Sequence, residues 1–344
     1  DKVRRILRLC FRTNMNRNRG FGSRNSAQHS ADALAIQQEG IVLLKNEGDI
    51  LPIDKSRFRR ILVVGENADF CLTKYGGSSG VKARYEVMPI DAIRKIAGNE
   101  VKIEYQKGYT SDWPRNTQVE DSLRIEALKA AGKADLIVFI GGHNKHPCHD
   151  SESYDRSGTK APYRQEELLV GLLKEKAPLV LVTMGANQFD MPYAEKIPAM
   201  LHAWYGGSES GTALAQVLFG EVNPSGKLPV TFYRQLNDCG AIAMGEYPGD
   251  GKNVRYNEGI FVGYRYVDKF DVKPQFHFGH GLSYTKFRYG KPIADRMKIH
   301  SGDTIKISVP VTNVGNRSGK EVVQLYVHDE KASVPRPVKE LKGF

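Results

Sequence analysis

Four short apolar runs in the first two thirds of the chain have the length and composition of buried strands. They cover residues 61–64, 136–140, 180–182 and 199–204. Stretches of helical character alternate with them, near residues 89–97, 122–131, 165–174 and 211–219. Continuous apolar strands separated by helices are typical of a parallel sheet that helices cover on both faces. The pattern therefore predicts an α/β fold built on a mostly parallel α/β/α sandwich.

The segment before this sandwich has helical spacing. Apolar residues at positions 3, 6, 7, 10 and 11 predict a short amphipathic helix, and the polar stretch 13–26 indicates a linker. A longer helix is expected over residues 29–44, ending near the turn residues 46–48. These elements precede the first buried strand and do not belong to its alternating pattern.

The chain after residue 223 changes in character, because Pro, Gly and aromatic residues replace helix-forming residues. Residues 304–311 then alternate between apolar and polar, residues 313–319 supply a turn, and residues 321–328 form a second strand pattern. This resembles the opening strands of an immunoglobulin-like sandwich, which needs about seven strands. We expect a partial immunoglobulin-like β domain here. Since Asp1 is not a methionine and no closing element follows the strand pattern at 322–327, we expect both ends of the chain to be cut.

The net charge of +11 is concentrated near the start of the chain, where residues 1–24 hold seven Arg and Lys2 against Asp1. A basic face on one helix favours a solvated surface over a nucleic-acid site. No run of about 18 apolar residues predicts a membrane span. The four cysteines are scattered and form no Cys-x-x-Cys pair, so neither a disulfide framework nor a zinc ribbon is indicated.

A carboxylate-rich loop, residues 151–156, supplies the main chemical candidate. It follows the apolar run 136–140 and precedes a helix pattern, and ligands of parallel sheets gather at the carboxyl ends of strands. Asp150, Glu152 and Asp155 crowd around Arg156, and neighbouring charges shift carboxyl pKa values toward acid/base duty. We predict Glu152 as the catalytic group, and we expect Asp155 and Arg156 to form an ion pair that fixes the loop.

Other motifs fall short of their templates. Residues 143–150 hold five potential metal ligands, but their spacing is irregular, so a polar binding loop is predicted in place of a metal site. The glycine-rich segments 76–80 and 249–252 lack the phosphate-loop pattern, and residues 65–69 carry one glycine where a dinucleotide site needs three. No cofactor is therefore expected, and a flavodoxin-like nucleotide-binding domain is disfavoured.

Seven motifs in one order carry a family resemblance. Glu152 lies in one of them, and together they occupy residues 41–47, 151–156, 203–209, 219–229, 263–266, 278–284 and 334–341. They resemble the carboxyl-terminal part of a family 3 glycoside hydrolase of the β-glucosidase kind. In that family a (β/α)8 barrel supplies an aspartate nucleophile, an α/β sandwich offers the acid/base glutamate on a loop, and a fibronectin-III-like domain braces both.

The resemblance implies a division of the chain. Residues 1–45 would be the last barrel helix and a linker, and residues 46–235 the sandwich that carries the acid/base loop. Residues 236–283 would form a crossing linker, and residues 284–344 an incomplete fibronectin-III-like domain. The barrel itself, with the nucleophile, would be missing from this chain.

The resemblance also implies a reaction, the hydrolysis of terminal non-reducing β-D-glycosyl residues with retention of configuration, and glucosyl is the residue expected. The family's acid/base position falls on Glu152, the residue that its place after the strand also indicates. His149, Tyr154 and Arg156 would bind substrate on the aglycone side.

Two strings imitate barrel motifs and are not carried over. Residues 111–113 read Ser-Asp-Trp, like the family's nucleophile motif, and residues 145–146 read Lys-His, like its sugar-binding pair. The first follows a sandwich segment and the second stands in the acid/base loop. Neither is in a barrel context.

The expected partners are a β-linked oligosaccharide or glycoside and the amino-terminal barrel, with no nucleic acid and no membrane span. A homodimer and a periplasmic or secreted location are further expectations. The rival interpretation is a non-catalytic carbohydrate-binding or scaffold module. A barrel with its own carboxylate in the intact protein would decide against that rival.

Overall fold

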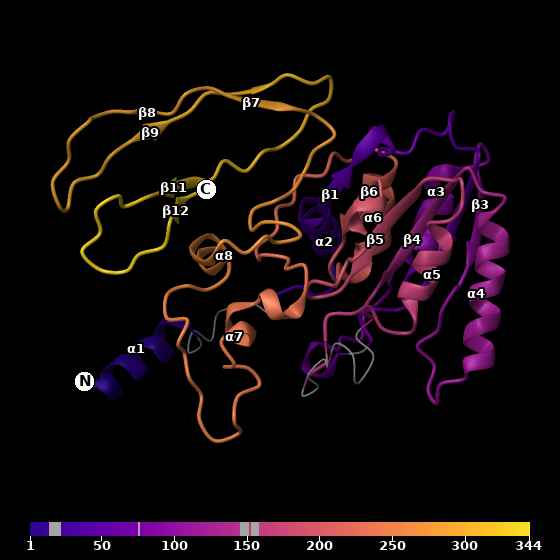
Figure 1. The fold of residues 1–344 in the computed structure, drawn as a ribbon, viewed down its shortest axis with the longest axis horizontal. Helices are drawn as coiled ribbons and strands as arrows, with labels where there is room; N and C mark the ends of the chain where they lie inside the picture. Colours follow the sequence, from indigo (N-terminus) through magenta and orange to yellow (C-terminus); the bar gives the residue numbers. More distant parts are fainter. Residues whose placement is uncertain (14–21, 75, 145–150, 153–157) are drawn as a thin grey trace.

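The computed structural model describes residues 1–13, 22–74, 76–144, 151–152 and 158–344. Its main element is a six-stranded sheet with the order β1-β6-β5-β4-β2-β3 (Figure 1). The strands are β1 (Val42–Asn46), β2 (Arg60–Val64), β3 (Lys102–Gln106), β4 (Leu136–Gly142), β5 (Leu179–Met184) and β6 (Ala199–His202). Neighbouring strands are parallel except β1, which runs antiparallel to β6. The predicted, mostly parallel sheet is confirmed.

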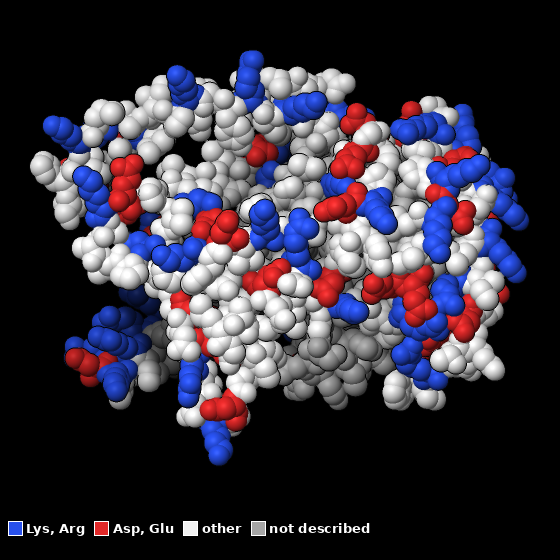
Figure 2. Space-filling view, in the orientation of Figure 1, with Lys and Arg blue, Asp and Glu red and all other residues white. Residues whose placement is uncertain are grey.

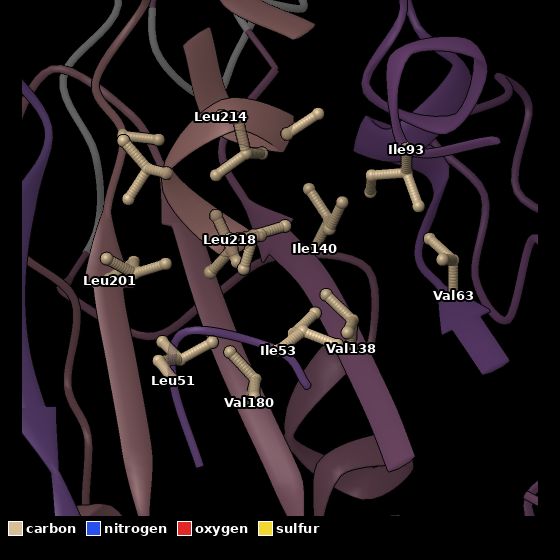
Figure 3. Packing of buried hydrophobic residues seen from close by; sticks show 14 of the residues in the cluster. Leu51, Ile53, Val63, Ile93, Val138, Ile140, Val180, Leu201, Leu214 and Leu218 are labelled. Carbon is tan, nitrogen blue, oxygen red and sulfur yellow. The ribbon is translucent and has the colours of Figure 1, made fainter. Parts of the chain in front are cut away.

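Helices cover both faces of this sheet. Val63, Val138 and Val180 belong to the core under α3 (Pro89–Ala97) and α6 (Ser210–Leu218), as Figure 3 shows. Ile137 and Leu181 belong to the opposite core under α4 (Thr117–Ala131) and α5 (Gln165–Leu172). Because the central strands bury side chains on both faces, they contain uninterrupted apolar runs. This is why their sequence signal was clear.

The helix expected over residues 29–44 is wrong in its last part. Helix α2 (Ala27–Gly40) ends at Gly40, and the next residues form β1. Ile41, Val42, Leu43 and Leu44 are between 0% and 2% exposed, which suits a buried strand better than one face of a helix. The outer edge of β1 is covered, since the Leu282 amide donates to the Leu43 carbonyl at 2.8 Å.

Strand β3 was not predicted. Its polar residues Lys102, Glu104 and Gln106 alternate with Ile103 and Tyr105, and all but Lys102 are half-buried. It lies at the far edge of the sheet, where its one neighbour is β2. Its apolar content is therefore too low to stand out from a polar loop. Its register is nevertheless regular, with Val63 beside Tyr105 in parallel pairing.

The strand order creates a switch point between β2 and β4. The chain leaves β2 to one side to form β3 and returns on the other side to form β4. The loops that follow β2 and β4 therefore diverge at the carboxyl edge, where ligands of open α/β sheets bind. Only glycine fits at position 65, where the chain leaves β2. A Cβ there would lie 2.0 Å from the Ile140 carbonyl oxygen, and the φ of Gly65 is +123°.

The amino-terminal helix α1 (Lys2–Thr13) forms as predicted and projects away from the sandwich (Figure 1). Arg4, Arg5, Arg8 and Arg12 are exposed. Figure 2 shows the basic side chains gathered on this helix, whereas those over the visible face of the sandwich are interspersed with acidic ones. Within the described residues, no helix is long and apolar enough to cross a membrane.

The carboxyl-terminal part contains small antiparallel sheets. The pairs are β7 (Phe287–Tyr289) with β10 (Val311–Asn313), β8 (Ile293–Ala294) with β9 (Ile307–Ser308), and β11 (Leu325–Val327) with β12 (Glu340–Gly343). The antiparallel character is confirmed, and the strands are shorter than predicted. Asn223 joins this part to the sandwich, because its Oδ1 accepts from Ser283 Oγ and the Tyr284 amide, both at 2.8 Å.

Limited proteolysis should cut the chain first after about residue 285. Most of residues 287–344 are half-buried or exposed and their strands are two to four residues long, so local opening there is easy. Mass mapping of trypsin fragments should show early cuts near the exposed Arg288, Arg296 and Lys298, with residues 41–235 kept intact. Early cutting inside that sandwich, or equal protection through residue 344, would contradict the expectation.

Candidate functional site

Glu152 lies beside the loop that follows β2. Its Oε2 accepts a hydrogen bond from the Ser78 amide at 2.7 Å, and Ser78 belongs to the short 3-10 turn η3 (Gly77–Ser79). Ser151 is half-buried and Glu152 is exposed. The two loops that diverge at the switch point therefore meet again at this carboxylate.

Hydrogen bonds hold Glu152 in its charged form. The side chain of Ser78 and then its backbone amide lower the pKa of Glu152 below the ordinary value, against a smaller opposing effect of burial. Donors that point at a carboxylate favour the anion. Glu152 is thus a carboxylate at neutral pH in this structure, which is the form that accepts a proton.

A buried charge lies at the base of the same edge. Glu66, in the turn η2 (Glu66–Asp69) after β2, has a side chain only 4% exposed and pairs with Lys107 Nζ at 2.9 Å. Its carboxylate also accepts from the Ser111 amide at 2.8 Å and from Asn144 Nδ2 at 3.3 Å. Glu66 therefore joins the segments that follow β2, β3 and β4.

Asn67 and Tyr163 complete this network. Asn67 Nδ2 donates to the carbonyl of His143 at 2.9 Å and to that of Gly141 at 3.2 Å. The Tyr163 hydroxyl donates to Asn144 Oδ1 at 3.1 Å, from a residue with φ of 61°. Side chains from two loops thus fix residues 141–144, from which the loop carrying Glu152 starts.

The sequence pointed to this edge but missed its supporting residues. Residues 65–69 and 76–80 were considered only as failed nucleotide or phosphate motifs. Their position after the strand 61–64 was the available signal for Glu66 and Ser78, because loops at the carboxyl edge of neighbouring strands converge. Ser111, whose motif imitates the nucleophile's, serves here to bind Glu66 through its backbone.

Several predicted residues lie outside the described part of the chain. These are His149, Tyr154 and Arg156, together with the alternative carboxylates Asp150 and Asp155. Of the ligand-rich stretch 143–150, the structure describes His143 and Asn144, both buried. Among the residues described, no group of three or more His, Cys, Asp or Glu could hold a metal ion.

A cavity of about 330 Å³ lies away from Glu152, between α5 and residues 189–193. Phe139, Leu181 and Met191 are among its apolar lining residues. The connection from β5 to β6 carries only the 3-10 turn Ala194–Lys196 where another helix would cover the sheet. This thin cover accounts for the cavity, whose lining also includes polar residues such as Gln165, Asp190 and Arg234.

Comparison with known families identifies the fold. Residues 41–284 match the family model described as the glycosyl hydrolase family 3 C-terminal domain, and residues 321–344 match the fibronectin type III-like domain. The chain belongs to glycosyl hydrolase family 3. The family resemblance inferred from the seven motifs is confirmed.

Other family 3 proteins extend the comparison. The chain is 44% identical to "Beta-glucosidase BoGH3A" of Bacteroides ovatus over all of its own length and 48% of that protein's. It is 36% identical to a "Beta-xylosidase" of Formosa agariphila over 92% of the chain and 42% of that protein. The crystal structure of the Bifidobacterium adolescentis family 3 β-glucosidase superposes with a TM-score of 0.87 at 32% identity, covering 98% of this chain and 48% of that one. The chain thus spans about half the length of the curated relatives it matches.

The substitution Glu66→Gln should destabilise the sandwich. It leaves Lys107 without its buried counter-charge and turns an amide toward the Ser111 amide, so a loss of about 2 kcal/mol in the free energy of unfolding is expected. Urea unfolding followed by circular dichroism measures it. The control is Glu47→Gln. Glu47 pairs with Lys45 but its side chain is 66% exposed, so this substitution should change the free energy of unfolding by less than about 1 kcal/mol. Equal effects of the two substitutions would contradict a special role for Glu66.

Proposed function

We propose that this chain supplies the acid/base half of a retaining β-glycosidase that removes terminal non-reducing β-D-glucosyl residues. The observation that carries the proposal is the position of Glu152. This carboxylate stands at the switch point of a family 3 sandwich, where the loops after β2 and β4 meet. Membership of the family and the names of the relatives support the reaction class.

The proposed chemistry has two steps. Glu152 first donates a proton to the departing glycosidic oxygen while an aspartate nucleophile from a barrel domain bonds to the anomeric carbon. The Glu152 carboxylate then takes a proton from water, whose oxygen attacks the same carbon and releases the sugar from the aspartate. Retention by this route needs two carboxyl groups about 5 to 5.5 Å apart.

A barrel domain is a required partner in this proposal. Apolar side chains on α1 are exposed: Val3 is 69%, Ile6 61% and Phe11 66% exposed. These exposed side chains support a partner domain that packs against α1. The coverage of about half of each relative supports the same partner.

Substrate recognition would be divided between the two domains. His149, Tyr154 and Arg156 are proposed to contact the aglycone, and the barrel to bind the glycone. The relatives include a protein named for glucose and one named for xylose. We propose glucose because the β-glucosidase is the more similar of these two, at 44% against 36% identity. A β-linked oligosaccharide or glycoside would be the substrate.

This chain by itself should not hydrolyse aryl β-glycosides. An acid without its nucleophile can protonate the leaving oxygen but cannot form the glycosyl intermediate. The measurement is release of nitrophenol from nitrophenyl β-glucoside by the purified chain, with the full-length enzyme assayed in parallel. Turnover by the chain comparable to that of the full-length enzyme would refute the division of the site.

In the full-length enzyme, Glu152→Gln should affect substrates according to their leaving groups. General acid/base help is worth about 10² to 10⁴-fold, so cellobiose-like substrates should lose most activity. A dinitrophenyl glycoside should still form the intermediate quickly and then stall, because its hydrolysis lacks the base. Added azide needs no base, so it should restore turnover and yield a β-glycosyl azide.

The pH profile gives a second measurement on Glu152→Gln. Glu152 is expected to set the upper pKa of the carboxyl pair, so the basic limb should flatten and the acid limb should remain. The control Glu47→Gln, at an exposed carboxylate, should keep both limbs and all substrate preferences. Equal losses on both kinds of substrate without azide rescue would make Glu152 a structural carboxylate. Asp150 or Asp155 would then be the next candidates. If replacing any of these carboxylates left the activity unchanged, the chain would be better described as a non-catalytic module.

A further inference from the structure

The loop of residues 70–88, between β2 and α3, touches both ends of the Glu152 side chain. The Ser78 amide is 2.7 Å from Oε2. At Gly77 there is no room for a side chain, because a Cβ there would lie 2.6 Å from Glu152 Cβ and 2.9 Å from its Oε2. The 70–88 loop therefore contacts the carboxylate and also limits where the chain of Glu152 can go.

The tip of this loop has a defined shape. Gly76 and Gly77 have φ values of 108° and 67°, a region that favours glycine. The Ser79 amide donates to the Gly76 carbonyl at 3.3 Å and the Gly80 amide to the Gly77 carbonyl at 2.9 Å. These two amides are bonded inside the turn, and the amide just before them, that of Ser78, is the one that donates to Glu152.

Glu86 closes the base of the same loop. Its carboxylate accepts from the Leu72 amide at 2.8 Å, from the Thr73 amide at 3.2 Å and from Thr73 Oγ1 at 2.6 Å. The Val81 amide also donates to the Thr73 carbonyl at 2.8 Å. One side chain thus ties the start of the loop to its end.

The loop is also fastened to the sandwich. The Val87 amide donates to the Ser208 carbonyl at 2.8 Å, and the Tyr85 hydroxyl donates to the carboxylate of Glu209. Ser208 and Glu209 lie directly before α6, which packs against the sheet. The position of Ser78 is therefore set by the core of this domain.

We propose that the 70–88 loop is the positioning element of the acid/base, in which Ser78 orients Glu152 and Glu86 holds Ser78 in place. The inference rests on the proposed function, since it assigns a role to Ser78 only if Glu152 transfers the proton. The bonds from Ser78 hold the Glu152 carboxylate in one orientation, with the Ser78 amide on Oε2. They also stabilise the carboxylate that forms when the leaving oxygen is protonated, which is the form that water needs next.

The closing experiment compares two glycine substitutions in the full-length enzyme, Gly77→Ala and Gly98→Ala. Gly98 has φ of +64°, close to the +67° of Gly77, but nothing lies within 4 Å of its missing Cβ. Both changes place alanine at a positive φ that disfavours a side chain, and only Gly77→Ala displaces Glu152. The comparison separates backbone strain from the effect on the carboxylate.

For Gly77→Ala, the basic limb of the pH profile should move to higher pH. The reason is that loss of the Ser78 donors removes what lowers the pKa of Glu152. The rate with cellobiose-like substrates should fall by about tenfold to 100-fold, as expected for a misplaced catalytic group, with a smaller loss for a dinitrophenyl glycoside. Gly98→Ala should keep the limb and the substrate pattern.

Ser78→Ala is the second variant, and it keeps the backbone amide and so the shape of the turn. It should move the basic limb in the same direction, which preserves the test if Gly77→Ala fails to fold. Glu86→Gln should give the same signature, because an amide cannot accept all three bonds of the carboxylate.

Unchanged limbs in Gly77→Ala and Ser78→Ala would overturn the role of the loop, as would equal losses on all leaving groups. Glu152→Gln decides the proposed function separately. If azide rescues Glu152→Gln while the loop variants behave like Gly98→Ala, Glu152 is the acid/base and the loop does not position it. If azide fails to rescue Glu152→Gln, the acid/base assignment falls, and the proposed role of Ser78 falls with it.

Discussion

The buried carboxylate of Glu66 is the interaction on which the geometry of the site depends. The chain leaves strands β2, β3 and β4 in different directions, and beyond the strands it loses the regular hydrogen bonds of strand pairing. Glu66 replaces these with bonds to Lys107, to the Ser111 amide and to Asn144. A charge buried this deeply costs several kcal/mol unless it is paired, so the three segments must keep their positions for the fold to remain stable.

Two carboxylates therefore share one edge and have opposite environments. Glu66 is enclosed and its bonds are satisfied within the protein, which suits a structural group. Glu152 is exposed and is held in place by Ser78, so its carboxylate has a fixed position that solvent reaches. The polar network around Asn144 fixes where the loop carrying Glu152 begins, and the 70–88 loop limits where the Glu152 side chain lies.

The elements that the sequence predicted well are those whose signal lies in their side chains. The runs 61–64 and 136–140 are apolar because both faces of the strands are buried, and α1 has a clear helical period. Residues 41–44 were assigned to a helix because an apolar run that follows a helical pattern does not show where the period changes. Strand β3 escaped notice because an edge strand with one covered face keeps charged residues.

The same distinction explains the site. The position of Glu152 at the carboxyl edge could be predicted because it follows a buried strand, and its catalytic role stays a prediction. The contact with Ser78 could not, because its amide is common to nearly all residue types and depends on the φ values of Gly76 and Gly77. Glu66 could not be separated from a solvated glutamate, since its burial follows from loops that are distant in sequence.

The proposed reaction adds a requirement that the sandwich alone does not meet. A general acid must hold a proton near neutral pH, but Ser78 lowers the pKa of Glu152 and solvent reaches its side chain. Raising that pKa takes exclusion of water and a second negative charge nearby. The barrel would exclude water as it covers the edge, and its nucleophilic aspartate, about 5 to 5.5 Å away, would supply the charge. Once the glycosyl bond forms, the aspartate charge is consumed, and the pKa of Glu152 falls back toward the value set by Ser78. In the proposed enzyme, the sandwich therefore fixes the position of Glu152 and its base form, and the barrel controls when Glu152 is an acid.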